Sequence, residues 1–273
     1  AIDPVREHEL AETFGVTVIK GDVTHDFMLQ KLRLHRVRRV MLLGGNDFVA
    51  FEAASKILRL YPKLASQIVL HGRSLRFLRA MQNTQIANQV TLFNSYNLAA
   101  KGLVNSALIA HFKKTNYQDT VVIAGFGLFG QTILEELQMN AGDEINLVAI
   151  VDKEAYRRVQ IVDEQQKSGV FYERKIYEGD TTHPDVWRQL TDDIDLNRGE
   201  PVVIMGTGDS ANNLRTALWI KQHHSNALLF ARTNDTSEFA QAVGDEHGVH
   251  CTSITQLVED NIPLAWTGLD KLV

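Results

Sequence analysis

Short apolar runs alternate with stretches of helical periodicity along the whole chain, which is the pattern of β-α-β units around a parallel sheet. In the second half we predict five strands, rich in β-branched and other apolar residues, at 120–124, 146–151, 171–177, 201–205 and 227–231. Helices are expected between them, at 131–137, 155–167, around 185–190 and at 211–222. The pattern predicts an α/β fold with a doubly wound parallel sheet of the Rossmann kind.

The first half of the chain repeats the later part of this series. Residues 16–24 (VTVIKGDVT) match residues 174–182 (RKIYEGDTT), which predicts a strand and a Gly-Asp turn in both places. Residues 40–47 (VMLLGGND) match residues 202–209 (VVIMGTGD), and both runs lead into alanine-rich helices. A repeat period of about 160 residues (174 minus 16 is 158) indicates duplicated domains rather than a solenoid.

We therefore predict two Rossmann-like lobes, one over 1–115 and one over 116–273. The second lobe begins with its strand, glycine loop and helix, whereas the first begins at Ile2-Asp3-Pro4, which correspond to Ile150-Val151-Asp152 at the end of the second strand. The first lobe is thus expected to lack its opening strand and glycine-loop helix, most simply because the sequence is a fragment of a longer polypeptide. The alternative is that residues 1–12 form an irregular N-terminal arm.

Composition narrows the class of protein. Of the 273 residues 44% are hydrophobic and 22% charged, the balance of a globular protein that buries a core. The formal net charge of -5 argues against a nucleic-acid partner, whose binding surface normally carries a clustered basic excess. The single cysteine, Cys251, excludes an internal disulfide framework and suits a reducing compartment. We expect no signal peptide and no membrane span, and the nearest candidate, 98–112, reads as a packed helix because Lys101 interrupts it.

The hexapeptide that follows the first strand of the second lobe has the form G-x-G-x-x-G, and it reads Gly125-Phe126-Gly127-Leu128-Phe129-Gly130. Alone the motif is a weak signal, but here it leads from a strand directly into a helix, as dinucleotide binding requires. Gly125 would permit the tight turn, Gly127 the approach of a pyrophosphate, and Gly130 close packing of helix on strand. The free N–H groups of the helix N-terminus would then face the phosphates.

Asp152 ends the second strand, at the position where an acid accepts hydrogen bonds from the ribose hydroxyls of an adenosine. An acid there would repel a 2′-phosphate and so favours NAD(H) over NADP(H), a preference that the adjacent Lys153 weakens slightly. The competing interpretation is an empty Rossmann-like fold whose glycines serve packing alone.

Two further turns are expected at the same edge of the sheet, because they also follow strands: Gly179-Asp180-Thr181 and Gly206-Thr207-Gly208. Asp180 could bind a ligand or cap the next helix. Arg232, at the end of the fifth strand, could reach a phosphate, bind a partner subunit or form a surface ion pair.

The search for a catalytic set finds none. There is no G-x-S-x-G, H-E-x-x-H or G-x-x-x-x-G-K-[ST] motif, and only about 40 residues follow the fifth strand, too few for a substrate domain. His247, His250 and Cys251 have a spacing that suggests a metal, but Gly248 is expected to break the helix and Val249 to favour a strand. We therefore predict a protein that is not an enzyme and holds no metal.

The glycine loop, the acid at 152 and the turns at 179–181 and 206–208 together resemble the RCK (regulator of potassium conductance) or TrkA-N domain family. The first lobe, with its Gly-Asp turn at 21–24 and its loop at 44–47, is similar to a second copy that lacks its start. The resemblance covers nearly the whole chain. Its specific part is the Gly-Asp-x-Thr turn in both halves, coupled to the glycine loop.

The resemblance implies cytoplasmic ligand-sensing domains of a potassium channel or potassium transport system, at the inner face of the cell membrane. It implies that NAD(H), or else ATP, ADP or AMP, binds to Gly125, Gly127, Gly130, Asp152, Gly179 and Asp180. The implied partners are a potassium-conducting membrane protein, on the same chain or separate, and further copies of this chain, in a dimer at least.

Segment 97–112 fits the helix with which such domains cross over to a neighbour, although it could also only join the two lobes. It offers an apolar stripe to a second copy, formed by Leu98, Leu103, Val104, Ala107 and Leu108. Two other functional hypotheses stay open: an NAD-dependent oxidoreductase, and a pair of lobes that binds no ligand.

Overall fold

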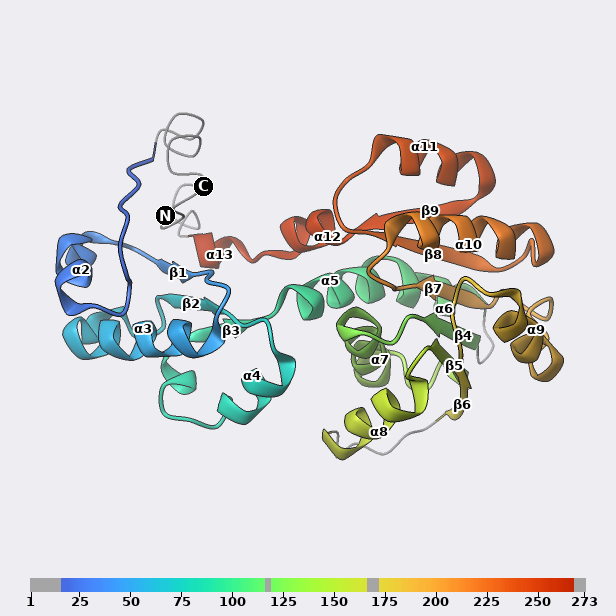
Figure 1. Cartoon of the computed structure of the whole chain (residues 1–273), viewed down its shortest axis with the longest axis horizontal. Coiled ribbons are helices and arrows are strands. Elements are labelled where there is room, and N and C mark those ends of the chain that lie inside the picture. Colours follow the sequence, from blue (N-terminus) through green and yellow to red (C-terminus); the bar gives the residue numbers. More distant parts are fainter. Residues whose placement is uncertain (1–15, 116–118, 166–171, 268–273) are drawn as a thin grey trace. The chain divides into compact units, whose positions relative to one another are not determined.

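The computed structural model describes residues 16–115, 119–165 and 172–267. Contacts between Cα atoms divide the chain into two compact units, unit 1 with residues 1–94 and 263–273 and unit 2 with residues 95–262. Figure 1 labels the elements of both units. The predicted lobe boundary between residues 115 and 116 concerns the sequence repeat and stays a prediction, while by their contacts residues 95–115 belong to unit 2.

Unit 2 contains a parallel sheet of six strands, which confirms the α/β class. The strands are β4 (Asp119–Ala124), β5 (Ile145–Asp152), β6 (Glu173–Glu178), β7 (Val202–Met205), β8 (Leu228–Thr233) and β9 (Val249–Ser253). They pair in the order β6-β5-β4-β7-β8-β9, which is the strand order of a Rossmann fold. The sheet grows in one direction from β4 and in the other from β7, so the switch point of the topology lies between these two strands.

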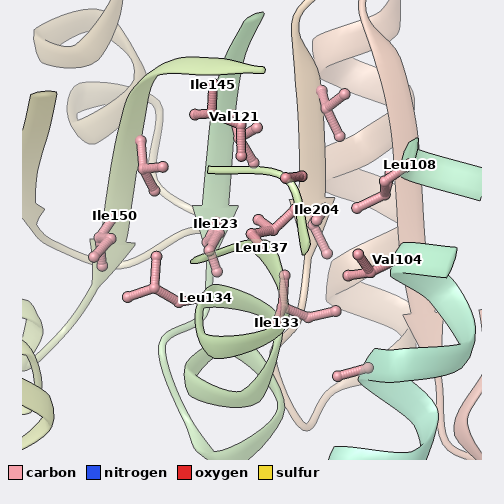
Figure 2. Packing of buried hydrophobic residues seen from close by; sticks show 14 of the residues in the cluster. Val104, Leu108, Val121, Ile123, Ile133, Leu134, Leu137, Ile145, Ile150 and Ile204 are labelled. Carbon is pink, nitrogen blue, oxygen red and sulfur yellow. The ribbon is translucent and has the colours of Figure 1, made fainter. Parts of the chain in front are cut away.

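Helices cover both faces of this sheet because its strands send apolar side chains to both sides. One face packs against α5 (Ser95–Leu103), α7 (Leu128–Asn140), α8 (Ala155–Gln165) and α12 (Ile254–Asn261). The other packs against α9 (Pro184–Asp193) and α10 (Ser210–His223), while α11 (Glu238–His247) leads into β9. Figure 2 shows the first of these layers, with Ile133, Leu134 and Leu137 of α7 packed beside Ile123 of β4.

The predicted packed helix at 98–112 lies in this same layer. It is a continuous helical stretch formed by α5, a π-helical turn η4 (Val104–Leu108) and α6 (Ile109–Thr115). Leu103, Val104 and Leu108 are at most 2% exposed and belong to the core of unit 2. The expectation that this stripe is free for a second copy is therefore wrong, because α7, α12 and the sheet already cover it.

Unit 1 contains a parallel sheet of three strands among its described residues, β1 (Val40–Leu42), β2 (Ile68–His71) and β3 (Thr91–Phe93), paired in that order. Its helices are α2 (Asp26–Lys31), η1 (Leu34–Arg36), α3 (Asp47–Leu60), η2 (Pro62–Leu64), α4 (Leu75–Met81), η3 (Ala87–Gln89) and α13 (Leu264–Thr267). The succession β1-α3-β2 corresponds to β7-α10-β8, as the sequence repeat predicted.

The Gly-Asp turns of the two units have the same hydrogen bonds. Asp22 Oδ1 accepts from the backbone N and the Oγ1 of Thr24 at 2.8 and 2.7 Å, and Asp180 Oδ1 accepts from the same atoms of Thr182 at 2.9 and 2.8 Å. The strand before the turn exists only in unit 2, as β6, and residues 16–20 form none. β6 pairs with β5, whereas no strand neighbours residues 16–20 in the described part of the chain, so their backbone groups lack sheet partners. The prediction of a strand there is wrong for this reason.

Candidate functional site

The register of the sheet in unit 2 brings the predicted site residues to one edge. Ala124, the last residue of β4, is paired with residue 151 of β5 and residue 205 of β7, and residue 205 is paired with residue 231 of β8. The residue that follows each of these positions therefore lies at the carboxyl edge of the sheet, and in sheet order these residues are Asp152, Gly125, Gly206 and Arg232. Open α/β sheets bind ligands at this edge, beside the switch point.

A cavity of about 370 Å³ opens at this edge. Nine of the predicted site residues line it, namely Gly125, Gly127, Asp152, Lys153, Asp180, Thr181, Gly206, Thr207 and Gly208. Four residues that we did not predict for the site line it as well, namely Arg158, Thr182, Asp209 and Asn212. Arg232, for which the sequence left contact with a phosphate open, completes the lining. The carboxyl ends of five adjacent strands, with the loops and helices that follow them, thus supply one concave, polar site.

The other five predicted residues lie outside the lining. Phe126 and Phe129 are at most 1% exposed and belong to the core, while Leu128 is 42% exposed. A Cβ at Gly130 would overlap the carbonyl oxygen of Gly125, and a Cβ at Gly179 would lie 3.0 Å from Val186. Packing against the backbone therefore requires the glycine at 130, while a side chain at 179 would have to displace that of Val186.

The glycine loop turns sharply from β4 into α7, which begins at Leu128 and so three residues before its predicted start. Gly125 has a φ of +96°, in the left-handed region, and a Cβ there would lie 2.6 Å from the backbone N of Thr207. Gly127 is the N-cap of α7, has no side chain to cap the helix, and has an ordinary φ of -73°. The first N–H groups of α7 are thus left uncapped toward the cavity.

Asp152 is 7% exposed, and the protein itself orients its carboxylate. One oxygen accepts from the backbone N of Phe126 at 2.7 Å, and the other accepts from the backbone N of Glu154 at 2.9 Å. Arg158, in the first turn of α8, places its Nε 3.3 Å from Asp152 Oδ1. The side chain at 158 thus neutralises part of the charge of the acid, a contact that no motif in the sequence signalled.

Asp180 shapes the turn after β6 and does not cap the next helix. His183 is the N-cap residue of α9, where its side chain accepts from the backbone N of Asp185. Asp180 instead accepts from Thr182 and pairs with Lys153, whose Nζ lies 3.0 Å away. The hydrogen bonds from the backbone and side chain of Thr182, together with the one from Lys153, lower the pKa of Asp180 to about 2. The carboxylate therefore stays ionised throughout the physiological range.

A buried asparagine holds the loop after β7. Asn213 is 1% exposed, and its Oδ1 accepts from the backbone N and the Oγ1 of Thr207. Its Nδ2 donates to the carbonyl oxygens of Thr207 and Arg232, both at 2.9 Å. Asn213 thereby ties the loop at 206–208 to β8. Asp209 next to this loop caps α10 by accepting from the backbone N of Asn212 at 3.0 Å.

Arg232 lines the same cavity and is 8% exposed. Its Nη1 donates to the carbonyl oxygen of Gly206 at 3.3 Å, and its Nη2 donates to Asn234 Oδ1 at 2.9 Å. The guanidinium carbon lies 5.3 Å from the ring centre of Tyr96 and 5.6 Å from that of Phe129. Of the three roles the sequence left open for this residue, the burial contradicts the surface ion pair.

His247 lies on a helix and His250 and Cys251 lie on a strand, with the break at Gly248 that the sequence predicted between them. α11 ends at His247, Gly248 adopts a left-handed conformation with a φ of +69°, and Val249 begins β9. Within the described residues, no cluster of three or more histidine, cysteine or acidic side chains could hold a metal ion.

None of the described helices has both the length and the apolarity that crossing a membrane demands.

One comparison with known proteins gives a family for part of the chain, and another gives a fold. Residues 121–250 match the family model of the TrkA-N domain. Among solved structures, the chain is similar to GsuK bound to ADP (16% identity, TM-score 0.61, covering 95% of this chain and 60% of that one). It is also similar to the GsuK RCK domain (13%, 0.57, 100% and 69%) and to the GsuK channel (12%, 0.61, 94% and 57%).

The family model and the structural matches cover different parts of the chain and support different conclusions. The chain spans about 60% of the length of the first of these structures. At such low identities the structural matches show the fold, while the family model adds sequence evidence for residues 121–250. Among curated proteins, no sequence matches significantly.

Proposed function

Because residues 121–250 of this chain are a TrkA-N domain, we propose that the chain is a nucleotide-sensing regulatory part of a potassium channel or potassium transport system. The observation that carries the proposal is the cavity at the switch point of unit 2, where the glycine loop, Asp152 and the turn at Asp180 meet. The likeness to GsuK supports it, since one of the similar structures is bound to ADP.

The geometry of the cavity favours one orientation of the ligand. The diphosphate lies at the uncapped N-terminus of α7, where N–H groups and the helix dipole attract negative charge. A Cβ at Gly127 would approach only the Nη1 of Arg158, at 3.5 Å, so the backbone is open to a phosphate there. The ribose then lies one strand away, against Asp152.

Asp152 favours a ribose without a 2′-phosphate, because a carboxylate accepts from hydroxyl groups and repels a further anion. Arg158 weakens that repulsion, since it already pairs with the acid and is itself about one-third exposed. The ligand of the proposal is therefore NAD(H) or an adenine nucleotide such as ATP, ADP or AMP.

Regulation requires the ligand to bind one arrangement of the protein more tightly than another. A tenfold change in open probability needs about 1.4 kcal/mol of differential binding, which one or two hydrogen bonds to a charged phosphate can contribute. In this proposal the partner is a potassium-conducting membrane protein at the inner face of the cell membrane. Copies of the chain assemble beneath it, and the nucleotide undergoes no reaction.

The first test is calorimetric titration of the chain with ADP, NAD⁺, NADH and NADP⁺. We expect one equivalent of an adenine nucleotide or NAD(H) per chain, because the described part of unit 1 contains no G-x-G-x-x-G loop between a strand and a helix. NADP⁺ is expected to bind more weakly than NAD⁺. The absence of binding by every nucleotide would contradict the proposal, and turnover of NAD⁺ or NADH with a hydride acceptor or donor would favour an oxidoreductase instead.

The second test replaces the acid at the ribose. Asp152→Asn keeps the shape of the side chain and removes its charge, so we expect the affinity for ADP and NAD⁺ to fall by about fivefold to tenfold. Asp192→Asn on α9 is the matched control, because Asp192 is exposed and does not line the cavity. Equal nucleotide affinities of the two variants would show that Asp152 does not contribute to ligand binding.

The regulatory part of the proposal is tested by potassium flux through the full-length system in lipid vesicles, with and without ADP or NAD(H). Nucleotide-dependent flux that Asp152→Asn shifts to higher nucleotide concentration is the expected result. Potassium flux that does not change with any nucleotide, in the wild type and in the variant, would contradict gating. The result of the binding experiment would still stand.

A further inference from the structure

Arg232 carries a buried charge that has no carboxylate partner among the described residues. It is 8% exposed, and its Nε is buried with no hydrogen-bond partner. Its two hydrogen bonds go to neutral groups, the carbonyl oxygen of Gly206 and the amide oxygen of Asn234. In the described part of the chain, no carboxylate lies within salt-bridge distance of this guanidinium. Burying an unpaired charge is costly, so such groups usually have an ionic partner.

The other cations of the cavity differ in this respect. Lys153 pairs with Asp180 at 3.0 Å, and Arg158 pairs with Asp152 at 3.3 Å. Asp209, the remaining acid of the lining, is occupied with the backbone N and the side chain of Asn212. The acids of the lining are thus already engaged, and among the described cations that line the cavity Arg232 is the one without an acidic partner.

The position of Arg232 indicates which part of a ligand it meets. Its guanidinium carbon lies 5.6 Å from the ring centre of Phe129, which belongs to the first turn of α7. A Cβ at Gly206, whose carbonyl Arg232 contacts, would lie 3.4 Å from the same ring. The guanidinium therefore sits beside the N-terminus of α7, where the helix dipole already favours an anion. Tyr96 of α5 flanks it on a second side, with 5.3 Å between ring centre and guanidinium carbon.

We propose that Arg232 is the cation that receives a phosphate group of the ligand, so that this cavity selects phosphorylated nucleotides over the bare nucleoside. The proposal rests on the nucleotide-binding function proposed above and deepens it by naming the group that recognises the phosphate. A guanidinium presents a planar fork of N–H donors that matches the oxygens of a phosphate, and a charge held in a buried site is screened little by salt.

The experiment compares ADP, adenosine and inorganic pyrophosphate on the whole chain. The readout is the ratio of the adenosine Kd to the ADP Kd, which cancels changes that affect the adenosine part alone. Loss of a charge-assisted hydrogen bond in Arg232→Gln is expected to lower this ratio by about 10- to 100-fold. Arg232→Lys keeps the charge without the fork and should lower it less. Arg215→Gln is the matched control, since Arg215 is an exposed arginine on α10 outside the cavity lining.

Thermal unfolding provides a second readout that does not depend on nucleoside binding. Pyrophosphate is expected to raise the Tm of the wild type and of Arg215→Gln, and to leave the Tm of Arg232→Gln unchanged. If Arg232 only holds the loop at Gly206, its substitution will lower the Tm and leave the preference for ADP over adenosine unchanged. That result would overturn the proposal. If Arg232→Gln does not fold, the ratio measured for Arg232→Lys decides: a ratio equal to that of the wild type overturns the proposal.

The outcomes separate this inference from the function on which it rests. A wild type that binds ADP and adenosine equally well, or that pyrophosphate does not stabilise, overturns the role of Arg232 and leaves nucleotide binding intact. A wild type that binds neither ADP nor NAD⁺, but gains stability from pyrophosphate through Arg232, overturns the nucleotide proposal and supports an anion site.

Discussion

The three glycines of the loop at 125–130 have different reasons to be glycine. At Gly125 the backbone is left-handed and the backbone of Thr207 fills the place of a Cβ, while at Gly130 the carbonyl oxygen of Gly125 fills it. Gly127 has an ordinary φ and space around it. The first two glycines are therefore needed by the fold, and only Gly127 is free to be explained by a ligand.

This division predicts opposite results for two substitutions. Gly125→Ala should destabilise the protein by about 1–3 kcal/mol, because it combines a strained φ with a steric overlap, and should lower the Tm by several degrees. Gly127→Val should leave the Tm close to that of the wild type and abolish ADP binding, since its side chain occupies the approach of the diphosphate. Thermal unfolding and calorimetry check both. A Gly127→Val variant that binds ADP normally would show that the loop is only structural, and Gly44→Val serves as a control because nothing lies within 4 Å of its Cβ position.

At the scale of the element, the N-termini of two helices, α7 and α10, contribute to the electrostatics of the site. α7 presents an uncapped N-terminus to the cavity, whereas α10 begins with the carboxylate of Asp209 as its cap. That cap stabilises the helix and at the same time places an exposed negative charge beside the cavity. The two functions of Asp209, as a cap and as a charge, can be separated by substitution.

Asp209→Asn should keep the cap, because asparagine and aspartate are similar N-cap residues, and should tighten ADP binding by roughly twofold to fivefold through reduced repulsion. Ser237→Ala at the N-cap of α11 is the comparison: it should cost about 1 kcal/mol of stability and leave ADP binding unchanged. Unfolding curves and titrations of the two variants measure both effects. Unchanged ADP binding by Asp209→Asn would mean that no phosphate approaches the N-terminus of α10, and weaker binding would mean that the carboxylate itself contacts the ligand.

At the scale of the whole molecule, the two units differ in how completely their sheets are covered. In unit 2 both faces of the sheet pack against helices. In unit 1, β1 pairs with β2 alone among the described strands, and an apolar groove of about 540 Å³ lies next to it. Large apolar side chains around this groove are exposed, among them Met41 at 38%, Leu43 at 59% and Val49 at 36%. An unpaired strand edge beside exposed apolar surface commonly takes part in association.

We therefore expect the chain to self-associate, to a dimer at least. Light scattering at micromolar concentrations should give more than the mass of one chain, and Leu43→Glu should shift the distribution toward the monomer. Met139→Glu is the control, because Met139 is 69% exposed, belongs to α7 of unit 2 and does not line this groove. A monomeric wild type, or equal effects of the two substitutions, would contradict the role assigned to this surface of unit 1.

Local signals in the sequence were enough for most elements of unit 2 and for nine residues of the cavity lining. Asp152, Gly125 and Gly206 could be predicted because each follows an apolar strand, and the carboxyl ends of parallel strands meet at one edge. Arg158, Asp209 and Asn212 could not be predicted, since nothing in a local pattern marks which residues at the start of a helix turn toward the cavity. The failed strand at 16–20 has a related cause, because a strand exists only where a neighbour pairs with it.

The sequence by itself determined the alternation of strands and helices, the glycine loop, the repeat of the Gly-Asp turn and the break at Gly248. These features depend on residues within a few positions of one another, through side-chain periodicity, permitted φ values and short-range hydrogen bonds. Only the tertiary structure decided that the stripe at Leu103 and Leu108 is buried within unit 2, and that Arg232 has no carboxylate partner among the described residues. Burial and charge pairing depend on which distant segments the sheet register brings together, and no local pattern encodes that register.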